Sequence, residues 1–89
     1  MRYLIQGGES ELRLTTLLGF TDIRSKPTIQ ALKDHLQSNH LGLPDTRAAI
    51  RNGIELSNFS RALKRLNEVA EQYEVLKAYE LQHLKSAKR

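Results

Sequence analysis

The chain has 89 residues, of which 39% are hydrophobic, and it has no cysteine and a formal net charge of +4. Such a chain forms one domain, residues 1–89, with a small core, and the lack of cysteine excludes disulfides and thiolate chemistry and fits a reducing compartment. No apolar run approaches the ~18 residues of a membrane span, and the start lacks a signal-peptide core, so we expect a soluble cytoplasmic protein without a membrane partner.

The first elements in chain order are an arm and a helix. Residues 1–8 are expected to form an N-terminal arm, because Gly7-Gly8 is too flexible for the interior of an element. Tyr3-Leu4-Ile5 gives this arm an apolar patch. A first helix is predicted to begin at Ser10 and to stop at Gly19.

A second helix is predicted after Ser25, which can act as its N-cap, with Pro27 tolerated in the first turn. Residues 38–44 are expected to form a loop that ends in proline. Asp45 or Thr46 is expected to cap the short helix that follows. The core stripe of the second helix is formed by Ile29, Leu32 and Leu36.

The segment 45–66 has the pattern of a helix-turn-helix motif. Ala49 supplies a small residue where two helices would nearly touch, and Gly53, four residues on, permits a turn with positive φ. Ile54 follows as a core residue, and the next helix has an apolar stripe at helical spacing, made of Phe59, Ala62, Leu63 and Leu66.

The opposite face of that helix is polar and basic. Hydroxyl, amide and guanidinium groups are the side chains that reach phosphates and base edges, so we predict contacts with double-stranded DNA. The predicted DNA-binding residues are Arg47, Ser57, Asn58, Ser60, Arg61, Lys64 and Arg65. A plain solvated surface is the alternative, since any two amphipathic helices joined through glycine give similar spacing.

Charge is distributed unevenly along the chain. Residues 45–66 contain five basic and two acidic side chains, whereas residues 67–84 contain four glutamates and one lysine. This polarity favours nucleic-acid contact at the motif. It also leaves a rival hypothesis, in which an acidic face of Glu68, Glu71 and Glu74 makes the chain a helical protein–protein adaptor without DNA binding.

A long C-terminal helix is predicted because neither glycine nor proline occurs after Gly53. From near Ser57 to about Lys85 it would measure roughly 43 Å, more than so small a domain can cover. It either folds back at Asn67 or packs against the first helix and a second chain, as a homodimer or higher homo-oligomer. The predicted oligomerisation residues are Tyr73, Leu76, Leu81 and Leu84.

Other chemistry finds little support in the sequence. His35, His40 and His83 lack metal-ligand spacing and are expected at the surface or half-buried. The carboxylate pairs Asp22 with Asp34 and Glu71 with Glu74 are interpreted as solvent-facing surface. No nucleotide-binding glycine loop is present. We therefore expect no enzyme activity, metal, cofactor or small-molecule ligand.

Three runs resemble a known family: Leu17-Leu18-Gly19-Phe20, Ala31-Leu32-Lys33-Asp34-His35-Leu36 and Asn58-Phe59-Ser60-Arg61-Ala62-Leu63-Lys64-Arg65-Leu66. They are similar to the PapB/FocB-type transcriptional regulators of fimbrial adhesin biosynthesis, over about residues 17–79. The resemblance implies small, all-helical, oligomer-forming proteins that bind A·T-rich DNA near fimbrial operons, through the minor groove, as repressor or activator.

Carried over to this chain, the resemblance places the recognition segment at residues 57–66, with Arg61 and Arg65 as the foremost contacts. Two departures stand out, since the loop at 39–44 looks longer than in the family and the N-terminal arm shorter. The prediction is thus an all-α fold, a small helical domain containing a helix-turn-helix with a long C-terminal helix. We predict that the protein regulates the transcription of fimbrial or adhesin operons by binding DNA in a sequence-selective way.

Overall fold

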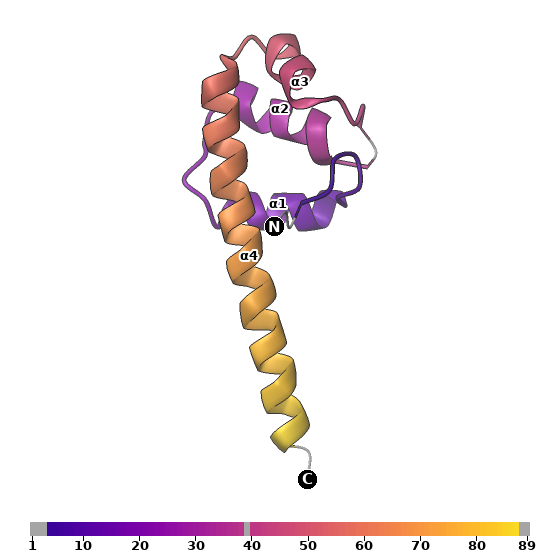
Figure 1. Cartoon of the computed structure of the whole chain (residues 1–89), viewed down its shortest axis with the longest axis vertical. Coiled ribbons are helices and arrows are strands. Elements are labelled where there is room, and N and C mark those ends of the chain that lie inside the picture. The colour runs from indigo at the N-terminus through magenta and orange to yellow at the C-terminus, as the bar shows by residue number, and fades with distance from the viewer. Residues whose placement is uncertain (1–3, 39, 88–89) are drawn as a thin grey trace.

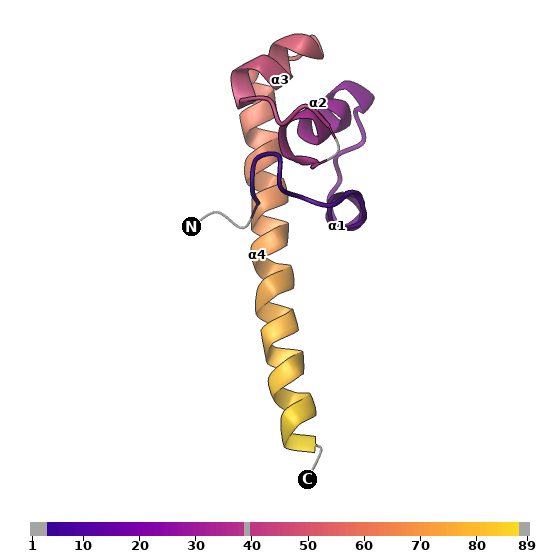
Figure 2. The same ribbon diagram turned by 90° about the vertical axis from the view of Figure 1, so that its right-hand side faces the viewer.

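A computed structural model of the chain describes residues 4–38 and 40–87, with the backbone alone for 83–87. The described residues form the helices α1 (Glu11–Gly19), α2 (Lys26–Leu36), α3 (Asp45–Arg51) and α4 (Leu56–Ala87) (Figure 1). The first three pack beside the N-terminal half of α4, and the other half of α4 extends alone (Figure 2). The molecule is therefore 54 Å long but only 23 Å by 22 Å across. The predicted all-α fold with a long C-terminal helix is confirmed.

Helix α1 begins and ends where the sequence predicts. The Ser10 hydroxyl accepts a hydrogen bond from the Arg13 backbone N–H at 3.1 Å, which satisfies one of the N–H groups left open at the helix start. At the other end, the Phe20 N–H donates to the Leu17 carbonyl at 3.0 Å, directly after Gly19. Side chains on one face of α1 are buried: Leu14, Leu17 and Leu18.

The starts of α2 and α3 differ in detail from the prediction. Ser25 occupies the N-cap position of α2, but its side chain makes no capping hydrogen bond. Pro44 precedes α3, so Asp45 lies inside the first turn instead of before it. There the Asp45 carboxylate accepts a hydrogen bond from the Thr46 N–H at 2.8 Å. A carboxylate in the first turn stabilises a helix N-terminus in much the same way as a cap.

The core lies between the first half of α4 and the other three helices. Phe59 is its largest fully buried side chain, and its ring meets that of His35 edge to face, with centroids 5.6 Å apart. The stripe predicted for α2 is buried at Leu32 and Leu36, while Ile29 packs at the edge of the core. Farther along α4 the buried side chains are Leu66, Val69 and Ala70.

The N-terminal segment packs against the end of α2. Leu4 is buried, and the Gly7 N–H donates to the His35 carbonyl at 3.0 Å. The Glu9 N–H donates to the Leu36 carbonyl at 2.9 Å. The expected arm is thus fixed to the domain from Leu4 onwards, because its own N–H groups satisfy carbonyls at the end of a helix. Of the predicted apolar patch, Ile5 is exposed, and Tyr3 lies outside the described residues.

Helix α4 continues through Asn67 without a break, so the alternative in which the chain folds back there is wrong. At 32 residues it is about 48 Å long. No helix in residues 4–38 and 40–87 is both long enough and apolar enough to cross a membrane.

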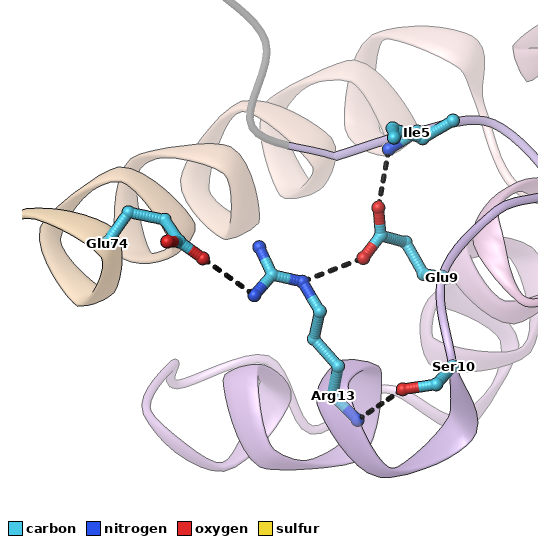
Figure 3. Close-up of polar contacts among 5 residues, drawn as sticks. All are labelled: Ile5, Glu9, Ser10, Arg13 and Glu74. Carbon is cyan, nitrogen blue, oxygen red and sulfur yellow. Dashed lines mark hydrogen bonds and ion pairs between the residues drawn. The ribbon is translucent and has the colours of Figure 1, made fainter. Parts of the chain in front are cut away.

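An ionic cluster joins α1 and the N-terminal segment to α4 (Figure 3). The Arg13 guanidinium lies between two carboxylates, with its Nε 2.8 Å from Glu9 Oε1 and its Nη1 2.9 Å from Glu74 Oε1. Glu9 also accepts a hydrogen bond from the Ile5 N–H at 2.7 Å. Burial lowers the pKa of Arg13, but the hydrogen bonds to Glu74 and Glu9 outweigh it and hold that pKa above its ordinary value.

Candidate nucleic-acid interface

Helices α3 and α4 form the predicted helix-turn-helix. Gly53 has a φ of +69°, the left-handed conformation that glycine adopts without strain. The turn is closed by backbone hydrogen bonds from the Gly53 N–H to the Ile50 carbonyl and from the Ile54 N–H to the Ala49 carbonyl, both 3.1 Å. Ala48 and Ala49 are fully buried, as two helices in close approach require, and Ile54 packs against the core.

The start of α4 has the predicted phase. Phe59 and Leu66 are fully buried, and Ala62 and Leu63 are partly buried against the same core. All of the predicted DNA-binding residues are exposed: Arg47 on α3, and Ser57, Asn58, Ser60, Arg61, Lys64 and Arg65 on α4. They therefore share one end of the molecule, where α3 and the first turns of α4 meet (Figure 1).

Most cations on this surface have no carboxylate partner among the described residues; the exception is Arg51, which lies 3.5 Å from Asp34. Within the part of the chain that the structure describes, Arg47, Lys64 and Arg65 form no ion pair. The Arg61 guanidinium donates a hydrogen bond to the Asn58 side-chain oxygen, a neutral partner on the same helix. Such guanidinium and ammonium groups remain available for phosphate oxygens or base edges.

The structure has a cavity between the N-terminal segment and the recognition helix. The sequence gives no sign of this cavity. The cavity measures about 290 Å³ and separates Leu4 and Gln6 from Ser60, Lys64 and the neighbouring part of α4. Gln6 is held in place by a hydrogen bond from its side-chain amide to the Gly42 carbonyl at 2.9 Å. Ser60 and Lys64 thus stand on the side of α4 that faces this segment.

Asp34 is not the solvent-facing carboxylate that the sequence suggests. It is only 3% exposed and forms hydrogen bonds to Asn52 and Gln30, with His40 and Arg51 close by. Burial alone would raise the pKa of the Asp34 carboxyl, but the hydrogen bonds from Asn52, Gln30 and His40 and the charge of Arg51 outweigh it, so that pKa lies below its ordinary value. Gln30 lies one helical turn away on α2, but His40, Arg51 and Asn52 lie outside α2, so helical spacing could not find these three.

One histidine, His35, also differs from expectation, whereas His40 is exposed as expected. His35 is buried, with its Nδ1 2.7 Å from the Leu43 carbonyl oxygen, where a surface or half-buried position was expected. His40 lies 3.4 Å from Asp34. The side chain of His83 lies outside the described residues. Both described rings therefore have structural partners in the protein.

The predicted oligomerisation residues are uncovered. Leu76 and Leu81 are 55% and 53% exposed, and Tyr73 is 39% exposed, while the side chain of Leu84 lies outside the described residues. Val75 and Tyr79 expose apolar surface on the same stretch of helix. Tyr73 borders a cavity of about 300 Å³ that Leu12 and Thr16 of α1 also line, so the apolar surface continues onto α1.

The chain is similar to a solved structure of a known protein. No protein-family model matches the chain, and no curated protein matches it. The crystal structure of FocB from E. coli matches with a TM-score of 0.76 and 29% sequence identity. The match covers 85% of this chain and 83% of the FocB chain. The chain is therefore a structural relative of FocB, and its predicted likeness to the PapB/FocB-type regulators is confirmed.

Proposed function

We propose that this protein is a sequence-selective, DNA-binding transcription regulator of fimbrial or adhesin operons. The observation on which the proposal depends is a group of cations, Arg47, Lys64 and Arg65, that pair with no carboxylate of the described residues and lie at one end of the molecule, on α3 and the first three turns of α4. Counterion release by such groups supplies most of the affinity of a protein for duplex DNA. The resemblance to the PapB/FocB-type regulators adds the preference for A·T-rich sites.

Positioning and readout are assigned to different side chains. Arg47 and Lys64 contact phosphates, whereas Arg61 and Asn58 lie toward the outer side of the recognition helix and reach base edges. The hydrogen bond between Arg61 and Asn58 holds the guanidinium over the helix surface before DNA arrives. A side chain ordered in advance loses less conformational entropy on binding.

The protein acts as a homodimer or higher homo-oligomer through the second half of α4. In this stretch Leu76, Tyr79 and Leu81 are each more than half exposed. Leucine and tyrosine side chains in such numbers on a single uncovered helix favour association. A two-fold dimer also presents two motifs to one DNA site.

The test is a salt titration of DNA affinity. On an A·T-rich duplex, with about four to six phosphate contacts per dimer, we expect the logarithm of the association constant to fall with a slope of about −4 to −5 against the logarithm of salt concentration. Changing both Arg61 and Arg65 to Ala should weaken binding strongly and flatten that slope. Lys77→Ala is the control, compared with the loss for each arginine removed, because it takes one cation from the same helix about 20 Å farther along its axis.

A slope near zero for the parent protein would overturn the proposal. It would favour the protein–protein adaptor, although Glu74, one member of the acidic face assigned to the adaptor, is engaged with Arg13 within the chain. Equal losses per charge removed in the Lys77 control and the double arginine variant would show that net charge, and not the recognition helix, determines the affinity.

A further inference from the structure

The buried carboxylate of Asp34 lies where several segments of the chain meet. Its Oδ2 accepts a hydrogen bond from the Asn52 side-chain amide at 3.0 Å and lies 3.5 Å from Arg51 Nε. Its Oδ1 accepts a hydrogen bond from the Gln30 side-chain amide at 3.1 Å and lies 3.4 Å from His40 Nδ1. Both carboxylate oxygens are thereby occupied by protein groups, which leaves Asp34 unsuited to contact DNA itself.

Asn52 connects this carboxylate to the turn of the helix-turn-helix. It is the C-cap of α3 and stands directly before Gly53. The same side-chain nitrogen that donates to Asp34 also donates to the Ala48 carbonyl at 2.9 Å. One amide group thus ties the last turn of α3 to α2.

The other end of α3 is tied to the same residue. The Leu43 N–H donates to the Asp34 backbone carbonyl at 2.9 Å, directly before Pro44 and the start of α3. Helix α3 has only seven residues, and a helix so short is not stable without tertiary contacts. Helix α3 is therefore tied to position 34 at both ends, at its start through the backbone carbonyl and at its end through the carboxylate.

We infer that Asp34 is a positioning residue for the helix-turn-helix. The backbone carbonyl at this position holds Leu43, and the carboxylate holds Asn52, so the side chain fixes the end of α3 on α2, and the turn then determines where α4 begins. Arg47 on α3 and Arg61 on α4 keep their relative positions only while this turn is held. The inference rests on the proposed function for its consequence in DNA binding, but the anchoring of the turn can be measured without DNA.

The experiment measures amide hydrogen exchange in two variants, Asp34→Asn and Asp22→Asn. The Asp34→Asn substitution keeps the shape of the side chain but removes its charge. It also replaces one acceptor oxygen by an NH₂ group, which cannot accept the hydrogen bonds that Asn52 and Gln30 donate to the carboxylate. Asp22 is an exposed aspartate and serves as the matched control. In Asp34→Asn we expect exchange at the Gly53 and Ile54 amides to accelerate about tenfold or more, relative to the amides of α1. Asp22→Asn should exchange like the parent.

DNA affinity is the second measurement on the same proteins. Asp34→Asn should bind an A·T-rich duplex at least several-fold more weakly than the parent, at a temperature where both are fully folded. If Asp34→Asn does not fold, Asn52→Ala replaces it, because that variant cuts the same link and leaves Asp34 its other partners. Asn52→Ala should loosen the same two amides.

Two results would overturn the inference. The first is exchange that accelerates equally in α1 and in the turn, which would mean that Asp34 contributes only to global stability. The second is a loosened turn with unchanged DNA affinity. A parent protein without salt-dependent DNA binding would refute the proposed function instead, and the exchange measurement alone would then decide whether Asp34 anchors the turn.

Discussion

Helix α4 passes through two different surroundings, and their comparison shows what determines burial in this molecule. In the head, defined as residues 4–70, Phe59, Leu66 and Ala70 are fully buried. In the tail, residues 71–87, Leu76 and Leu81 are more than half exposed, although their side chains are as apolar. The helix itself is continuous. Burial therefore depends on α1, α2 and α3, which cover the helix in the head, whereas in the tail only its first turns border α1 (Figure 2).

The same substitution placed in both regions gives the sharpest comparison. Leu66→Ala removes a fully buried side chain and should lower the free energy of unfolding by about 2–5 kcal/mol. Leu76→Ala, ten residues along the same helix, should cost less than about 1 kcal/mol in the monomer. Urea denaturation at a low micromolar concentration measures both. Equal losses would mean that the tail is covered in solution.

Within the head, the sequence predicts the features that depend on residues close together in the chain, and it misses those that depend on distant residues. The Ser10 cap, the glycine turn at Gly53 and the stripe through Phe59 each depend on residues a few positions apart, and each is confirmed. The burial of Asp34 depends on Asn52, eighteen residues away, and a single sequence gives no sign of such a pair. The sequence also does not determine whether the helix continues through Asn67. Asparagine is only a modestly weaker helix former, so tertiary packing determines whether the helix breaks there.

Charges placed in the tail should separate its role from that of the head. Replacing Leu76 and Leu81 by Asp should leave the helix content and the unfolding of the head almost unchanged, because both side chains are exposed. The proposed oligomer should dissociate, and DNA affinity should fall about a hundredfold as each motif then binds alone. Sedimentation velocity at tens of micromolar reports the mass. A parent that is already monomeric there, or a variant that stays associated, would place the interface elsewhere.

Acid should act on the head through Asp34. Its pKa lies below the ordinary value in the folded protein, so the unfolded chain takes up a proton first as the pH falls. The stabilisation is fully present above the unfolded pKa near 4 and is lost as the pH falls through the folded pKa. Thermal unfolding from pH 7 to pH 3 should therefore show a steeper loss for the parent than for Asp34→Asn. Parallel curves would mean that other carboxylates account for the acid sensitivity.

The smallest expected effect is that of Glu74, in the first turn of the tail, which Arg13 bridges to the head. Arg13 contacts both Glu9, which is 5% exposed, and Glu74, whose side chain is 35% exposed. Solvent screens the second pair, so Glu74→Gln should cost no more than about 0.5 kcal/mol. Glu9→Gln should cost more, about 1–3 kcal/mol, because it also weakens the hydrogen bond from the Ile5 N–H in a buried place. Unfolding measured on both single variants and on the double variant gives the coupling between the two carboxylates. A larger loss from Glu74→Gln than from Glu9→Gln would mean that the tail is held to α1 more firmly than the exposure of its side chains indicates.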